Sequence, residues 1–70
     1  MSEESKATTF GARVKEVREE LGISVQDACN RSGMEISEWS NVEENIVFPK
    51  VKTVWLMAIA LDVRPHNLLV

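Results

Sequence analysis

Cysteine and histidine are scarce in this chain of 70 residues, which has one of each, Cys29 and His66. A lone cysteine forms no internal disulfide, and one cysteine with one histidine falls short of the four ligands of a structural zinc ion. The sequence contains no glycine-rich phosphate-binding loop, and a domain of this size has little volume for a substrate pocket. We therefore expect no metal, no cofactor and no enzymatic activity.

Long apolar runs are also absent. The longest, residues 54–61, is well short of the roughly 20 residues that cross a bilayer. The first nine residues are polar and mixed in charge, without the apolar stretch of a secretion signal. We expect no contact with a membrane and a location in the cytoplasm, where a thiol stays reduced.

What remains has the composition of one small globular domain. Hydrophobic residues make up 44% of the chain and charged residues 27%, a balance that argues against disorder. A chain this short buries only about 60% of the surface that its unfolded form exposes, so its core depends on close packing or on association. We expect a flexible arm over residues 1–8 and a single folded domain over residues 9–70.

Helical periodicity accounts for nearly all of that domain. Apolar residues recur every three or four positions in segments that are separated by Gly22, Gly33 and Pro49. Thr8 or Thr9 suits the N-cap of the first segment, and Ser24 suits that of the second. The expected helices span residues 10–21, 25–32, 36–44, 51–61 and 65–69, with no strand.

Two short helices joined through a glycine and surrounded by three others are the layout of a helix-turn-helix domain. Residues 13–24 read RVKEVREELGIS, and characteristic residues follow at ordered spacing: Gly33, Ser40, Glu43, Pro49, Ala58, Ala60, Leu61 and Val63. Over about residues 10–69 the chain resembles the lambda-repressor-like, Cro/C1-type (XRE) family. This resemblance implies an all-α, compact five-helix domain in which helices 2 and 3 form the helix-turn-helix.

The resemblance also implies an internal ion pair. Family members commonly pair an arginine late in the first helix with a glutamate near the end of the third, and Arg18 and Glu43 stand at the matching positions. We expect this pair to tie the two helices together.

A DNA-binding regulator is the function that the resemblance implies, with the third helix in the major groove of double-stranded operator DNA. The free amides beside Ser24 at the start of the second helix suit a phosphate, and Lys50 suits another. Asparagine and serine bond to base edges, and an isoleucine contacts a thymine methyl group. The matching residues of the third helix are Ile36, Ser37, Ser40 and Asn41.

Several residues depart from the family pattern in that region. Val25 stands where the family very often has a glutamine, and the apolar run Ile46 to Phe48 stands where it tends to be polar or basic. Residues 24–48 hold one cation against five carboxylates, a net charge of −4 that weakens binding to phosphates. The alternative is therefore a helix-turn-helix domain that binds a protein partner through its acidic third helix and the Ile46–Phe48 loop.

The fourth predicted helix is apolar on nearly every side, which is typical of a helix that is covered all round. The family buries the positions of Val51, Val54, Trp55, Ala58 and Leu61. Leu56 and Ile59 match positions that are usually polar, so we expect a homodimer to cover them, with Leu69 at the edge of the interface. The alternative is a core that takes both residues inward. Cys29, Trp39, Trp55 and Phe48 are expected in the core.

Overall fold

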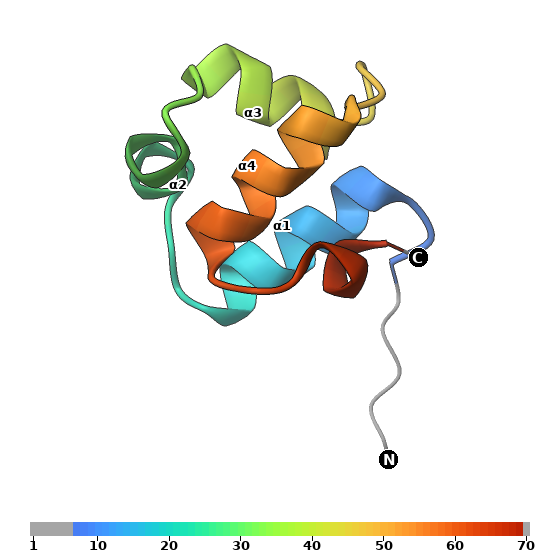
Figure 1. Ribbon diagram of the computed structural model, residues 1–70, viewed down its shortest axis with the longest axis horizontal. Helices are drawn as coiled ribbons and strands as arrows, with labels where there is room; N and C mark the ends of the chain where they lie inside the picture. Colours follow the sequence, from blue (N-terminus) through green and yellow to red (C-terminus); the bar gives the residue numbers. More distant parts are fainter. Residues whose placement is uncertain (1–6, 70) are drawn as a thin grey trace.

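The computed structural model describes residues 7–69, and these form four α-helices and one 3-10 turn without a strand (Figure 1). The elements are α1 (Phe10–Glu20), α2 (Val25–Ser32), α3 (Ile36–Glu43), α4 (Val51–Leu61) and η1 (Pro65–Leu68). The all-α prediction is confirmed for this part of the chain. The count of five helices is not confirmed, because the last predicted element is a single 3-10 turn, Pro65–Leu68. Most of the predicted arm, residues 1–6, lies outside the described residues, as does Val70.

Side-chain caps and left-handed residues set the ends of these helices. The Thr9 hydroxyl accepts from the Ala12 amide at 3.1 Å, and the Ser24 hydroxyl accepts from the Asp27 amide at 3.0 Å. Gly33 ends α2 with a φ of 79°, a backbone conformation that glycine adopts without steric cost. Asn45 after α3 and Asp62 after α4 are also left-handed. These caps confirm the predicted starts of α1 and α2.

The helices pack around one core, with α2 and α3 joined by the short turn of a helix-turn-helix. Helix α2 packs on α3 and α4, while α1 packs on α3, α4 and η1. Figure 1 shows α4 and α1 running in similar directions beside each other, and it shows the C-terminal turn returning beside α1. This arrangement leaves the outer side of α3 and the loop after it at one end of the molecule.

The largest fully buried side chains come from α1, α3, α4 and η1: Val14, Trp39, Met57, Leu61 and Leu68. The predicted core position of Trp39 is confirmed, and so is that of Cys29. Burial raises the pKa of the Cys29 thiol above its ordinary value, as expected for a thiol that serves as a small apolar side chain.

The predicted orientation of α4 is partly wrong. Trp55 is 55% exposed and Val51 is 75% exposed, although both were expected in the core. Helix α4 buries Met57, Ala58, Ala60 and Leu61 instead. Val51, Trp55 and Ile59 follow one another at intervals of four and form an exposed apolar stripe, here named the α4 stripe.

Two further apolar residues also lie outside the core. Leu21 caps the end of α1 and is 50% exposed, although it continues the apolar periodicity of that helix. Phe48 is 89% exposed, so the prediction that it packs onto the core is wrong. It stands in the loop between α3 and α4, where none of the described elements covers it.

Candidate nucleic-acid interface

A buried ion pair holds α3 against α1. Arg18 Nε donates to Glu43 Oε2 at 2.7 Å, and Arg18 Nη2 donates to Glu43 Oε1 at 3.1 Å. This two-bond geometry is the strong form of an arginine–carboxylate pair. Glu43 is only 7% exposed, and its hydrogen bond raises the pKa of Arg18. The contact that was predicted between these residues is therefore present.

Two more hydrogen bonds extend this pair into a network. Arg18 Nη1 donates to the Ile23 carbonyl at 2.8 Å, and Trp39 Nε1 donates to Glu43 Oε2 at 2.5 Å. The network joins Arg18 of α1 to Ile23, the residue before the N-cap of α2, and to Trp39 and Glu43 of α3. The part played by Trp39 was not predicted, although its spacing of four from Glu43 within one helix makes the contact possible. These bonds fix the orientation of α3 from the side of the helix that faces α1.

A close approach of two backbones fixes the far end of α3. Gly11 of α1 lies against the last turn of α3, and a Cβ added there would overlap the Val42 carbonyl oxygen. The same atom would lie 2.7 Å from Asn45 Oδ1 and 2.9 Å from the Glu43 carbonyl oxygen. Only glycine permits this spacing between α1 and α3.

The predicted base-reading residues lie on the solvent side of α3. Ser37 is exposed and Ile36 is 47% exposed in the first turn, while Ser40 and Asn41 are half-buried one turn later. Asn41 and Lys50 line the same hollow of about 330 Å³ between α3, the following loop and α4. Ser24 lies at the start of α2, outside this hollow. The structure thus brings Asn41 and Lys50 together and leaves Ser24 apart.

Carboxylates occupy the start of α3. Glu35 is the N-cap residue, and it forms a capping box with Glu38, whose Oε1 accepts from the Glu35 amide at 3.0 Å. Two negative charges therefore stand at the positive end of the helix dipole and accept from amides that would otherwise suit an anion. The four-residue pattern that begins at Glu35 was the available signal, and sequence analysis missed it.

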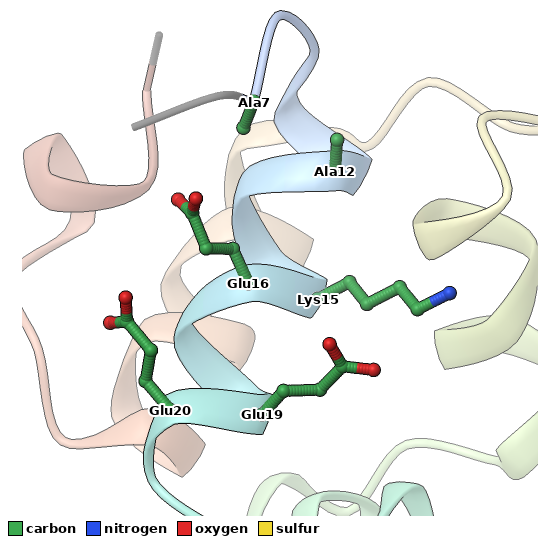
Figure 2. A pocket seen from close by; sticks show the side chains of 6 residues that line it. All are labelled: Ala7, Ala12, Lys15, Glu16, Glu19 and Glu20. Atoms are coloured by element: carbon green, nitrogen blue, oxygen red, sulfur yellow. The ribbon is translucent and has the colours of Figure 1, made fainter. Parts of the chain in front are cut away.

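The outer face of α1 is acidic too. Figure 2 shows Glu16 and Glu20 on one side of this helix and Lys15 and Glu19 on the other. Glu16 pairs with Arg13 at 2.7 Å, so that arginine is not an unpaired cation for DNA. Together with the start of α3, this face shows where a negatively charged partner is disfavoured.

The loop after α3 carries an exposed apolar cluster. Ile46 is 70% exposed, Val47 is 48% exposed and Phe48 is the most exposed of the three. The amides of Ile46 and Val47 donate to the Asn41 carbonyl at 2.8 and 3.3 Å, which ties the loop to α3. An apolar loop held in this way offers no charge to a phosphate backbone.

Two kinds of site find no support in residues 7–69. None of their helices has the length and apolar character that a membrane span requires. Their histidine, cysteine and acidic side chains nowhere gather in a group of three or more that would hold a metal ion.

Comparison with known proteins gives matches among solved structures. Comparison with protein-family models and with curated proteins gives no match. The restriction-modification controller protein C.AhdI from Aeromonas hydrophila is 30% identical, with a TM-score of 0.81, and the match covers 84% of this chain and 89% of that one. SinR, the master regulator for biofilm formation, in complex with DNA is 30% identical at a TM-score of 0.79, covering 86% and 97%. The N-terminal DNA-binding domain of SinR from Bacillus subtilis is 30% identical at 0.77, covering 84% and 87%.

Proposed function

This chain belongs to the lambda-repressor-like, XRE-type helix-turn-helix family, and we propose that it is a DNA-binding transcriptional regulator of the Cro/C1 type that reads the major groove with α3. One observation carries the proposal: the helices superpose on those of SinR in complex with DNA over 86% of this chain, at a TM-score of 0.79. As such a regulator the protein acts in the cytoplasm and catalyses no reaction.

The proposed contacts divide between bases and phosphates. Asn41 and Ser37 bond to base edges, and Ile36 contacts a thymine methyl group, with Ser40 between them on α3. Lys50 neutralises a phosphate, and the start of α2 beside Ser24 receives another. Asn41 and Lys50 line one hollow, so the proposed base contact of Asn41 lies beside the proposed phosphate contact of Lys50.

DNA binding is expected to be weak and strongly salt-dependent. In a fluorescence anisotropy titration with genomic DNA fragments, affinity should fall markedly between ~50 and ~200 mM salt, because phosphate contacts release counterions. Asn41→Ala and Lys50→Ala should each weaken binding by about 10-fold. Arg64→Ala is the matched control, since it removes a cation between α4 and η1, at the opposite end of the molecule from α3 (Figure 1). No binding at either salt concentration would contradict the proposal.

A second candidate function is contact with a protein through the same face. The capping-box carboxylates at the start of α3, Glu44 after it and the apolar Ile46–Phe48 loop favour this candidate, because a basic protein with an apolar centre complements them. Under this function the chain shows no salt-sensitive binding to DNA. The anisotropy titration therefore separates the two candidates.

The regulator is proposed to act as a homodimer on an operator with two half-sites. Ile59 is 64% exposed within the α4 stripe and Leu69 is 59% exposed, so both are open to a second copy. Leu56, the third residue predicted for this interface, is half-buried and lines the hollow that faces α3. It contributes at most an edge of the interface. A twofold axis would then bring two copies of α3 to successive turns of the major groove.

Replacing an interface residue by a charged one should weaken this dimer. Ile59→Lys is expected to weaken self-association by about 10-fold or more in sedimentation at tens of micromolar, because it buries an unpaired charge. Ile36→Lys makes the same change on α3, away from the α4 stripe, and should leave self-association unaltered. A wild-type chain that sediments as a monomer at that concentration would contradict the dimer.

A further inference from the structure

We propose that Phe48 of one copy of this chain inserts into an apolar groove of a second copy, and that the second copy returns the same contact. The groove, here named the Leu69 groove, has a volume of about 490 Å³ and lies between the start of α1, the loop after α3 and Leu69. The inference rests on the proposed homodimer and identifies a reciprocal contact that holds it together.

The lining of the Leu69 groove suits an aromatic side chain. Phe10, Val47, Pro49 and Leu69 form its apolar walls. Phe48 stands on its rim but remains 89% exposed, so its own ring does not fill the space. A volume of this size is at the lower end of those that accept small organic ligands, and it has room for a phenyl ring. The surface therefore presents an apolar projection and an apolar recess side by side.

That juxtaposition is what a twofold interface between identical copies requires. In such an interface both copies use the same surface patch. A side chain that projects from this patch must therefore fit a recess in the same patch of the other copy. Phe48 and the Leu69 groove lie on one surface, as this condition requires. Leu69 also belongs to the predicted dimer interface, so the Phe48 contact is continuous with it.

Charge opposes a second copy over much of the surface but not at the Leu69 groove. The chain carries a formal charge of −3, so two copies repel wherever their carboxylates meet, as they would across the outer face of α1 (Figure 2). Among the described residues, none with a charged side chain lines the groove, and its polar side chains are those of Thr8, Thr9 and Asn45. DNA would find no cation there, and a basic protein would find no carboxylate. The uncharged Phe48 side chain needs no charged partner in the groove and adds no repulsion between the two copies.

The area that two inserted rings bury is part of what a stable dimer needs. A buried aromatic side chain removes about 150–250 Å² from water, so the reciprocal pair contributes about 300–500 Å² of the roughly 1,600 Å² in a standard interface. The α4 stripe, which begins at Val51 three residues after Phe48, supplies further apolar surface. The two rings thus act as anchors within a larger contact.

The first test removes the projection. Phe48→Ala should weaken self-association of the full chain by about 30-fold or more in sedimentation equilibrium, the range of an anchor residue. Ile46→Ala is the matched control, because Ile46 is in the same loop, is 70% exposed and does not line the groove. Ile46→Ala should associate like the wild type. Equal association of Phe48→Ala and the wild type would overturn the inference.

The second test exchanges charges across the proposed contact. Phe48→Lys and Thr8→Glu, both at exposed positions, should each leave the chain folded and monomeric, because each puts an unpaired charge into the contact. An equimolar mixture should associate again, with one lysine–glutamate contact and one native Phe48 contact, and salt should weaken it. A mixture that stays monomeric would overturn the inference.

DNA binding is measured in a separate titration, so that the regulator proposal and the Phe48 contact can be contradicted independently of each other. A wild-type chain that binds DNA but sediments as a monomer would overturn the Phe48 contact and leave the regulator intact. A wild-type dimer that Phe48→Ala dissociates, in a chain that binds no DNA, would support the contact and overturn the regulator.

Discussion

Replacing Arg18 by alanine is expected to lower the free energy of unfolding by about 3–5 kcal/mol, the cost of leaving a buried charge without its partner. Glu43 is 7% exposed and would lose two of its three hydrogen bonds, keeping only the one from Trp39. The Ile23 carbonyl would lose its bond from Arg18 as well. For a domain of this size, such a loss removes a large part of the total stability.

Urea denaturation at pH 7, followed by circular dichroism, measures this loss. Arg31→Ala is the matched control, because the Arg31 side chain is exposed and makes one long contact, 3.5 Å to the Ala60 carbonyl. It should change the free energy of unfolding by no more than about 0.5 kcal/mol. If Arg18→Ala cost no more than Arg31→Ala, the network would not hold α3 to α1 as the distances indicate.

Features that depend on neighbouring residues in the chain were predictable from sequence. The caps at Thr9 and Ser24 follow from the residue type before each apolar segment, and Gly33 ends α2 because a left-handed residue is needed there. The pairing of Arg18 with Glu43 spans 25 residues and came from family resemblance rather than from periodicity. Long-range contacts of this kind need a known fold before a sequence can show them.

The orientation of α4 could not be predicted in this way. A helix that is apolar on nearly every side has no polar stripe to mark its outer face, so several rotations satisfy the sequence equally well. Packing against α2 and η1 selects the one that buries Met57 and Leu61 and exposes Trp55. The same absence of a polar side explains why α4 displays an apolar stripe at the surface.

The candidate base contacts were predictable only as positions on α3. The family pattern placed Ser37 and Asn41 on its outer side. The capping box of Glu35 and Glu38 leaves a spacing signal in the sequence, but whether both side chains turn back to the backbone amides depends on their rotamers. Phe48 illustrates the same limit for loops. Its exposure depends on whether another element covers it, and none of the described elements does.

Gly11→Ala is expected to destabilise the protein although it replaces glycine by the best helix former. Helix propensity alone predicts a gain of up to about 1 kcal/mol for this change in α1. The added methyl group would overlap the Val42 carbonyl oxygen and crowd that of Glu43, and neither oxygen can rotate away as a side chain would. Overpacking of this kind costs about 3 kcal/mol, so the net loss should be about 2 kcal/mol.

Gly33→Ala separates crowding from backbone strain in the same urea experiment. Gly33 has a φ of 79° and nothing within 4 Å of an added Cβ, so alanine there meets only the cost of a left-handed conformation, about 1–2 kcal/mol. Gly11 lies within α1 and has no such conformation, so its loss comes from contact with α3 alone. Stabilisation by Gly11→Ala would show that α1 and the end of α3 are farther apart than the structure places them. Destabilisation would show that α3 is held in place by close backbone packing as well as by the Arg18–Glu43 pair, since no charged group takes part in the contact at Gly11.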